Sequence, residues 1–511
     1  MLAKVKSAGT YGVEAYPVEV EVNVAQSEFS GVALVGLPDA AVKESLERVH
    51  AAVTNSGYHY RVHRLTVNLA PADMRKEGPA FDLPIAVGIL VATEQIVSPK
   101  LETFALTGEL ALDGRLRRVN GALSIALRCR AEGYAGLIVP EENAEEAGVV
   151  EGIEIIPLST LTQVVGFLTD HVAMESYRVD IREALREHSR YDVDFSEVKG
   201  QEHVKRALTV AAAGGHNALM VGPPGAGKSM LAQRLPTILP PMTIDEALET
   251  TKVYSVDGLT GRERSLIGTR PFRAPHHTVS EAGLAGGGAD PRPGEVSLAH
   301  HGVLFLDELP QFERRTLEVL RQPMEDGAVT ISRAKMSVTY PSQFMLICAL
   351  NPCPCGYLTD PRKECRCTPR QISAYLGKIS GPLLDRVDIQ VEVPAVHYRD
   401  LRSPADGEPS EVIRERVIRA RDMQRERFKG TKTFCNARMS ARLIKKHCKI
   451  DGAAETTLSA AMQSFALSAR AYSKILKLAR TIADLDGADE IRTEHVTEAI
   501  QYRSLDRNLW A

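Results

Sequence analysis

The chain has 511 residues, of which 44% are hydrophobic and 25% charged, a balance that is average for a folded protein and excludes a mostly disordered one. Its 62 basic and 65 acidic side chains give a net charge of −3, so any surface that binds nucleic acid must be local. Aromatic residues make up only 5%, which excludes broad stacking platforms for bases. At roughly 150 residues per domain, the length predicts about three domains.

Apolar segments of the sequence are too short for a membrane-spanning helix. The longest apolar run is the ten residues from Leu83 to Ala92, whereas a span needs about 20. The first residues of the chain lack the compact apolar core of a signal peptide. We therefore expect a cytoplasmic protein with no membrane partner.

The first part of the chain alternates β-like runs with helical patterns. In residues 1–168, a run such as 18–24 (VEVEVNV) has the period of a strand, and 82–95 (DLPIAVGILVATEQ) is typical of a buried helix. This alternation predicts an α/β or α+β domain. The polar and charged stretch 169–194 is expected to be a linker or a connecting helix.

The pattern changes after residue 194. Over 195–398, strand-like apolar runs alternate with helices and Gly/Pro-rich loops, which predicts a parallel sheet with crossover connections. Residues 399–511 have helical spacing in several consecutive segments and predict a helical domain. The fold class is therefore α/β, with a further domain before the parallel sheet and helices after it.

A phosphate-binding loop is predicted between an apolar strand and a helix. The motif G-x-x-x-x-G-K-[ST] is matched by Gly222, Pro223, Pro224, Gly225, Ala226, Gly227, Lys228 and Ser229. The glycines let backbone N–H groups surround phosphates, the lysine reaches the β- and γ-phosphates, and the serine hydroxyl can ligate Mg²⁺. We predict ATP and Mg²⁺ as cofactors.

Four further side chains are expected near this loop, at the ends of strands or just before one. The run 302–308 (GVLFLDE) ends in two carboxylates, of which Asp307 is expected to hold Mg²⁺ through water and Glu308 to polarise the attacking water. Another apolar run ends at Asn351, whose amide can orient the same water. Arg386 precedes a further strand, from which a guanidinium can reach a neighbouring subunit's γ-phosphate. The alternatives are an acidic turn for the carboxylates and a surface ion pair for Arg386.

Together these motifs resemble an AAA+ P-loop NTPase of the magnesium-chelatase-like branch, and specifically the YifB/ComM family. The resemblance rests on FSEVKGQ, GPPGAGKS, VLFLDE, ALNPC and LLDRVD, and on longer phrases such as FRAPHHTVSEAGLAGGG and SARAYSKILKLARTIADL. It covers nearly the whole chain. It implies that Asn351 is sensor 1, Arg386 the arginine finger and Arg470 sensor 2 in a C-terminal helical lid, 399–511. It also implies a homo-oligomeric ring, a hexamer, because each site needs the next subunit's arginine.

The N-terminal region resembles the Lon-protease-like α+β domain, which is also S5-like. The resemblance lies in 76–84 (KEGPAFDLP) and in two later segments, 108–115 and 119–125. The protease serine is replaced by Ala80, and the partner lysine aligns with Ile125. A Ser–Lys dyad needs both a nucleophile and a base, so we expect no proteolysis. The domain is expected either to stabilise the oligomer or to engage DNA.

Residues 324–341 predict a β-hairpin with a basic tip, Arg333-Ala-Lys335. In the related chelatase and replicative-helicase branches this hairpin faces the pore, where Arg333 and Lys335 would grip DNA phosphates without reading sequence. A solvated turn is the alternative. The basic stretch 411–432 is interpreted as a solvated helix face in preference to a second DNA surface.

Four of the eight cysteines lie in one loop, 353–367. Four thiolates on two short turns can close a tetrahedral zinc site, although the C-x-C spacing is tighter than the usual one. Free thiols are the main alternative, and a disulfide or an iron–sulfur cluster is a third. The members of the cluster are Cys353, Cys355, Cys365 and Cys367, while Cys129, Cys348, Cys435 and Cys448 are predicted to be core thiols.

The function that these features predict is an ATP-driven ring motor acting on single-stranded or branched DNA. The family resemblance implies helicase or branch-migration activity in recombination or natural transformation. One alternative is a magnesium-chelatase-type metal-insertion motor, which is disfavoured because the Lon-like N-terminal domain belongs to the YifB/ComM arrangement. The other is an ATP-switched assembly platform that does not translocate on DNA.

Overall fold

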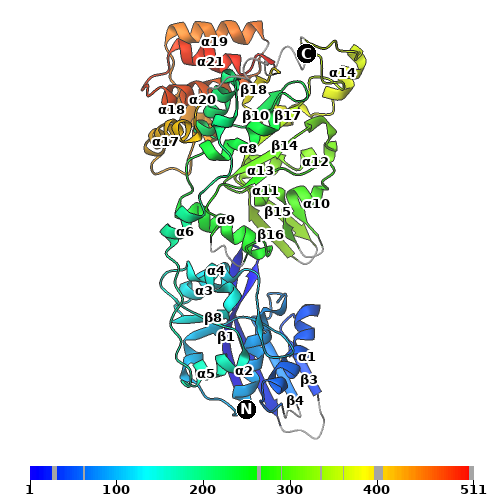
Figure 1. The fold of residues 1–511 in the computed structure, drawn as a ribbon, viewed down its shortest axis with the longest axis vertical. Helices are drawn as coiled ribbons and strands as arrows, with labels where there is room; N and C mark the ends of the chain where they lie inside the picture. Colours follow the sequence, from blue (N-terminus) through cyan, green and yellow to red (C-terminus); the bar gives the residue numbers. More distant parts are fainter. Residues whose placement is uncertain are drawn as a thin grey trace. The chain divides into compact units, whose positions relative to one another are not determined.

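The chain divides into two compact units in a computed structural model (Figure 1). The first unit consists of Met1–Ser189, Thr243–Gly268 and Ser332–Tyr340, and the second of Arg190–Met242, Thr269–Ile331 and Pro341–Ala511. The structure describes residues 1–25, 31–60, 64–261, 266–288, 291–333, 336–360, 362–395, 407–465 and 467–505. The predicted boundary between 398 and 399 therefore lies outside the described residues.

A seven-stranded mixed sheet forms the centre of the first unit, in the order β3-β4-β2-β1-β5-β8-β9. The pairs β1–β2 and β2–β4 are antiparallel, and the remaining neighbours are parallel. The predicted alternation in 18–24 is confirmed, because Val18, Val20 and Val22 are buried in the core. The strands are β1 (Leu2–Tyr11), β2 (Glu14–Ala25), β3 (Gly31–Val35), β4 (Arg64–Ala70), β5 (Phe104–Leu106), β8 (Gly136–Pro140) and β9 (Glu154–Leu158), with a separate hairpin of β6 (Glu109–Leu110) and β7 (Leu116–Arg117).

Helix α2 is the most buried helix of this unit. It packs on β1, β2 and α1, and ten of its eleven residues are buried, which explains why its sequence is apolar on all sides. The linker region 169–194 contains one short helix, α6. The helices of the first unit are α1 (Ala40–Asn55), α2 (Asp82–Ala92), α3 (Ala122–Ala131), α4 (Ala144–Gly148), α5 (Leu161–Leu168), α6 (Ile181–Glu187) and α9 (Ile244–Val256).

Helix α9 belongs to the first unit although it follows the phosphate loop in the sequence. It packs on α3, and the buried carboxylate of Glu146 links the two segments. Glu146 accepts hydrogen bonds from Ser255 Oγ at the end of α9, from the backbone N–H of Leu123 and from Arg118 Nη2 at 3.1 Å. No pattern in the sequence indicated this long-range attachment.

The second unit contains a five-stranded parallel sheet in the order β11-β14-β17-β10-β18. This confirms the parallel sheet that the sequence predicts. Because β14, β17 and β10 are neighbours, the segments that follow their carboxyl ends meet at one edge. The strands are β10 (Ala218–Val221), β11 (Phe272–Arg273), β14 (Val303–Leu306), β17 (Met345–Leu350) and β18 (Ile389–Glu392).

Several helices surround this sheet or follow its strands. The bounds are α7 (Glu202–Gly214), α8 (Lys228–Ile238), α10 (Glu281–Ala285), α11 (Glu295–Leu298), α12 (Arg314–Glu318), α13 (Arg321–Asp326), α14 (Pro369–Leu376) and α15 (Gly381–Leu384). A two-stranded ribbon of β12 (Gly286–Gly287) and β13 (Arg292–Pro293) lies between α10 and α11 in the sequence.

The C-terminal part is helical, as predicted, and shares one apolar core with the parallel sheet. Helices α19 (Gly452–Ser464) and α20 (Ala469–Leu485) are separate, and the Ser468 side chain begins the second one by accepting a hydrogen bond from the Ala471 N–H. The helices are α17 (Ser410–Arg427), α18 (Ala441–His447), α19 (Gly452–Ser464), α20 (Ala469–Leu485) and α21 (Thr493–Gln501). No helix in the described parts of the chain is both long enough and apolar enough to cross a membrane.

The predicted hairpin is confirmed as a two-stranded sheet of β15 (Ala328–Arg333) and β16 (Met336–Pro341). Its far half, Ser332–Tyr340, belongs to the first unit. There the hydroxyl of Tyr11 donates to the carbonyl oxygen of Ser337 at 2.7 Å. Arg333 is exposed, whereas Lys335 lies outside the described residues.

Candidate nucleotide site

The phosphate loop follows the fully buried strand β10 and leads directly into α8. Gly225 and Gly227 adopt φ angles of 76° and 87°, which favour glycine. A Cβ atom on Gly222 would lie 2.1 Å from the carbonyl oxygen of Val393, so only glycine fits there. The sequence motif is therefore required by the backbone of this turn. Helix α8 begins at Lys228, directly after the loop, and the first N–H groups of a helix favour an anion.

Lys228 lies inside this loop. Its Nζ donates to the carbonyl oxygens of Gly222 at 2.7 Å and Pro223 at 3.0 Å, and to Oδ1 of Asn351 at 3.0 Å. Burial lowers the pKa of Lys228, and the carboxylates of Asp307 and Glu308 oppose that shift. The ammonium group therefore binds the loop carbonyl oxygens and lies close enough to the carboxylates after β14 to interact with their charge.

The two carboxylates lie at the end of β14, as the sequence predicts for their strand. Asp307 Oδ2 accepts a hydrogen bond from Ser229 Oγ at 2.5 Å. Glu308 is exposed and has φ 52°, a left-handed conformation that costs a non-glycine residue energy. A carboxyl and a hydroxyl oxygen in contact are hard oxygen donors, a donor set that fits Mg²⁺.

The structure therefore brings four of the predicted residues together as two hydrogen-bonded pairs, which start from the consecutive residues Lys228 and Ser229. Ser229 contacts Asp307, and Lys228 contacts Asn351, which follows β17. Glu308 is adjacent to this group through its backbone N–H, which donates to Asp307 Oδ1 at 2.9 Å. Such an arrangement can bind phosphates, hold a divalent cation and place a carboxylate base beside both.

The two predicted arginines lie apart from this group. Arg386 pairs with Glu325 and donates from Nη1 to the carbonyl oxygen of Pro382 at 2.7 Å. Arg470, at the start of α20, donates from Nη1 to Asp385 Oδ2 at 2.9 Å, and 72% of its side chain is exposed. Among the interactions of the described residues, neither guanidinium group contacts the phosphate loop. Both are linked instead to the segment that precedes β18.

Two residues that the sequence analysis did not single out touch the pocket. Gln201 Nε2 donates to the carbonyl oxygens of Ala226 at 2.9 Å and Pro394 at 2.8 Å, so it fastens the phosphate loop. The buried phenol of Tyr375 lies close to the backbone of Asn351, and burial raises the pKa of this phenol to about 12. Gln201 lies in a motif quoted above, whereas no sequence signal marks Tyr375.

A buried polar network anchors the segment around Arg386. His216 Nδ1 lies 3.0 Å from Asp388 Oδ2, and His216 Nε2 lies 2.8 Å from Thr481 Oγ1 of α20. Lys474, also in α20, donates to the carbonyl oxygen of Val387 at 2.8 Å. The arginine-bearing segment is therefore held between the turn before β10 and helix α20. These residues are far apart in the sequence, so no motif reveals them.

The four cysteines of the loop converge. Cys353 Sγ lies 3.3 Å from Cys355 Sγ and 3.6 Å from Cys365 Sγ, and the Sγ atoms of all four cysteines lie within 4.8 Å of one another. The backbone N–H of Tyr357 lowers the pKa of Cys355 to about 6. The other cysteines are buried, as predicted: Cys129, Cys348, Cys435 and Cys448.

The basic helix α17 is largely engaged within the second unit. Arg421 Nη2 donates to the carbonyl oxygen of Ala212 at 2.9 Å, Arg414 to that of Thr237 at 3.4 Å, and Arg427 pairs with Asp484. Helix α17 packs on α7, α8 and α20. At least these three arginines therefore bind the protein itself.

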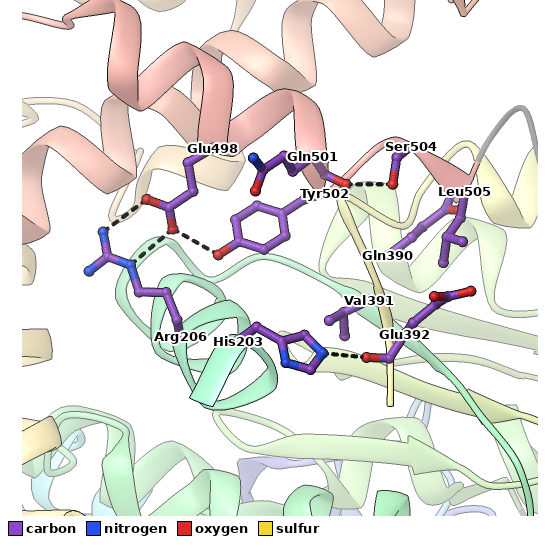
Figure 2. Close-up of a pocket in the computed structure, with 10 residues that line it drawn as sticks. All are labelled: His203, Arg206, Gln390, Val391, Glu392, Glu498, Gln501, Tyr502, Ser504 and Leu505. Carbon is purple, nitrogen blue, oxygen red and sulfur yellow. Dashed lines mark hydrogen bonds and ion pairs between the residues drawn. The ribbon is translucent and has the colours of Figure 1, made fainter. Parts of the chain in front are cut away.

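A cavity of about 400 Å³ lies among α7, β18 and α21 (Figure 2). Arg206 Nε donates to Glu498 at 2.9 Å and the Tyr502 hydroxyl donates to the same carboxylate at 2.8 Å, while a ring nitrogen of His203 contacts the Glu392 carbonyl oxygen (Figure 2). None of the predicted site residues lines this cavity.

Comparison with known proteins finds relatives that match nearly the whole chain and others that match part of it. Family models described as "Magnesium chelatase, subunit ChlI", "Subunit ChlI of Mg-chelatase" and "Magnesium chelatase, subunit ChlI C-terminal" match residues 194–401, 20–143 and 407–503. The chain is 44% identical to the competence protein ComM of Haemophilus influenzae and 42% identical to the protein YifB of Escherichia coli, with 99% of this chain and 98% of each relative covered. It is 24% identical to the magnesium-chelatase 38 kDa subunit of Rhodobacter capsulatus, over 60% of this chain and 87% of that protein.

Proposed function

Because the chain belongs to the YifB/ComM family of magnesium-chelatase-like AAA+ proteins, we propose that it is a cytoplasmic, ATP-driven ring motor that acts on DNA. The activity is unwinding or branch migration of single-stranded or branched DNA in recombination or natural transformation. The observation that carries the ATPase part is the pair of contacts from the phosphate loop to the strand ends, Lys228 with Asn351 and Ser229 with Asp307. The DNA part is supported by full-length similarity to a competence protein.

In this proposal each pocket residue has one role in ATP hydrolysis. Lys228 binds the β- and γ-phosphates, and Ser229 and Asp307 hold Mg²⁺, which neutralises phosphate charge when bound. Glu308 accepts the proton of the attacking water, and Asn351 orients that water through its amide. The backbone N–H groups of 222–229 bind the phosphate oxygens.

The two arginines serve the neighbouring subunit's site in this proposal. Arg386 directly follows Asp385 in the chain, and Arg470 forms an ion pair of 2.9 Å with Asp385. Both are held away from their own phosphate loop, so a neighbouring subunit is the natural place for their charge. A closed homo-oligomeric ring, a hexamer, gives every pocket such a neighbour.

The hairpin and the N-terminal region complete the proposed motor. Arg333 and Lys335 at the tip of the hairpin contact DNA phosphates in the pore. The first unit, as a Lon-like domain without the protease dyad, supports the ring and does not cleave peptides, since Ala80 lacks a nucleophile and Ile125 is a buried apolar side chain. Zn²⁺ at the four cysteines is a structural cofactor of the second unit.

A chelatase-type metal-insertion motor is the second candidate. It is favoured by the magnesium-chelatase family models, one of which matches residues 20–143, so the N-terminal region does not by itself exclude this function. The extent of similarity favours the DNA motor, because YifB and ComM cover 99% of this chain and the chelatase subunit of Rhodobacter capsulatus covers 60%.

One experiment separates the candidates. ATP turnover of the purified chain is measured side by side with single-stranded, duplex and branched DNA, and with a porphyrin and chelatase partner subunits, using Lys228→Ala as the control. The DNA motor predicts stimulation by DNA, and the chelatase predicts dependence on the porphyrin-binding partners. Slow turnover that none of these additions changes would support the assembly platform instead.

A further inference from the structure

The cysteine cluster has the dimensions of a four-thiolate metal site. Zn–S bonds of about 2.3 Å in a tetrahedron place the sulfur atoms roughly 3.8 Å apart. The Sγ atoms of Cys353, Cys355 and Cys365 form three pairs, separated by 3.3, 3.6 and 3.6 Å. These separations far exceed a disulfide bond of about 2.0 Å. The cysteines therefore converge on one point without being joined to each other.

The backbone of the loop also favours thiolates at this point. The N–H of Cys355 donates to Cys367 Sγ at 3.4 Å, and the N–H of Cys367 donates to Cys365 Sγ at 3.5 Å. Hydrogen bonds to sulfur stabilise the charged form that binds metal. Cys353 is fully buried and the other three are half-buried, so an ion at the cluster is largely shielded from solvent.

The first turn of this loop lies directly on the phosphate loop. Gly356, one residue after Cys355, has φ 85°, and a Cβ atom on it would lie 2.6 Å from Cδ of Pro224. The same Cβ would lie 3.8 Å from Cβ of Asn351. The cysteine turn therefore contacts both the phosphate loop and the residue that orients the attacking water in the proposed mechanism.

The C-terminal end of the cysteine loop also leads back to the nucleotide pocket. Helix α14 begins directly after Cys367, with Thr368 as its cap. Its Tyr375 side chain lies close to the backbone of Asn351 and near the carboxylate of Glu308. Both ends of the cysteine loop thus meet the pocket, one through Gly356 and one through Tyr375.

We propose that Zn²⁺ at Cys353, Cys355, Cys365 and Cys367 holds the nucleotide pocket in its binding conformation, so that ATP affinity depends on the metal. The ion joins the two turns of the loop and fixes the turn that supports Pro224 together with the helix that carries Tyr375. Tyr375 acts as a positioning residue for Asn351. This inference rests on the proposed nucleotide site and is independent of DNA.

The first test measures metal and nucleotide in the same samples. The full-length protein is analysed for zinc, iron and labile sulfide, then titrated with a fluorescent ADP before chelation, after chelation under reducing conditions, and after zinc is added back. We expect about one zinc per chain, and roughly tenfold weaker binding after chelation that zinc reverses. Iron with labile sulfide, or unchanged nucleotide affinity in the metal-free protein, would overturn the inference.

Variants keep the test independent of global folding. Cys365→Ser with Cys367→Ser should lose zinc and bind nucleotide weakly, while Cys448→Ala, outside the cluster, should change neither. Gly356→Ala should retain zinc yet bind nucleotide about tenfold more weakly, because the added methyl group is strained at φ 85° and meets Pro224. Normal affinity in Gly356→Ala would contradict the proposed contact. A wild-type protein that binds no nucleotide would instead refute the proposed function.

Tyr375→Phe isolates the positioning role. Removing the phenol oxygen takes away the polar group beside the backbone of Asn351 but leaves the cysteines intact. We expect unchanged zinc content and unchanged nucleotide affinity, with kcat lowered about fivefold to tenfold, the range for the loss of one buried polar contact. A normal kcat, or a changed affinity with a normal kcat, would remove Tyr375 from this role.

Discussion

The nucleotide pocket and the arginine-bearing segment are both built at the parallel sheet, yet their polar side chains have different kinds of partner. In the pocket, Lys228 and Asn351 are within hydrogen-bond distance, and each polar group faces another that serves the same proposed reaction. In the arginine segment, Arg386 and Arg470 are bound to acids of their own chain, and the Arg470 side chain is 72% exposed.

In the proposed ring, this difference separates residues that one chain assembles from residues that act on a second chain. A fold fixes groups on neighbouring strands, so one subunit alone assembles Lys228, Ser229, Asp307 and Asn351. An arginine that acts on another subunit needs a temporary partner, and an exposed ion pair is a weak one, worth about 0–1 kcal/mol. The comparison predicts that variants in the two regions affect binding and turnover differently.

The largest effect is expected for Arg386→Ala. Because an arginine finger contributes about 10³–10⁵ to turnover, this variant should lose nearly all ATP hydrolysis. Its own nucleotide binding should persist, since the Arg386 side chain contacts Glu325 and Pro382 and not the phosphate loop. Turnover and nucleotide titrations of the assembled protein measure both.

Mixing provides the control for action across an interface. Subunits with Arg386→Ala and subunits with Lys228→Ala should partly restore each other's activity, because some mixed interfaces join an intact pocket to an intact arginine. Absence of rescue at every ratio, with co-assembly demonstrated, would show that Arg386 does not act on the neighbouring subunit.

Glu308→Gln should lower turnover by about 10²–10⁴, the usual contribution of a general base. Nucleotide and Mg²⁺ binding should remain, since Ser229 and Asp307 keep their contact at 2.5 Å. Single-turnover hydrolysis measures the loss of catalysis, and a parallel binding titration shows whether nucleotide and Mg²⁺ binding remain. Near-normal turnover would assign the base to another group.

The local parts of this site are predictable from the sequence, because the phosphate loop is one continuous motif and buried strands have continuous apolar patterns. The pairing of Ser229 with Asp307 follows once a parallel sheet is assumed. The contacts of Tyr375 with Asn351 and of Glu146 with α9 are not predictable in this way, since each joins distant segments through ordinary side chains. Contacts of that kind depend on the folded geometry and leave no local pattern in the sequence.

Arg470→Ala should have a smaller effect than Arg386→Ala. We expect turnover to fall roughly 10- to 100-fold, corresponding to one hydrogen bond to a charged group of about 1.5–3 kcal/mol. Asp385→Asn sharpens the comparison, because it releases Arg470 from its ion pair without removing the guanidinium. Turnover of Asp385→Asn should stay near that of the wild type. A loss as large as in Arg470→Ala would mean that the ion pair itself is required.

The smallest effect is expected at the hairpin, and it decides the DNA part of the proposal. Neutralising Arg333 and Lys335 to alanine removes two phosphate contacts, so affinity should fall equally for all DNA sequences. The log–log slope of affinity against salt should decrease by about 1.4 on single strands and about 1.8 on duplex.

Basal turnover should survive in this double variant, because neither residue belongs to the nucleotide pocket, whereas its stimulation by DNA should decrease. Lys429→Ala with Lys432→Ala is the matched control, since it removes the same charge beyond the end of α17, at two exposed positions. Salt titrations of binding are run with all three proteins, and turnover is assayed in parallel. If slope, affinity and stimulation match the wild type, the hairpin is a solvated turn held by Tyr11, and DNA must be bound elsewhere or not at all.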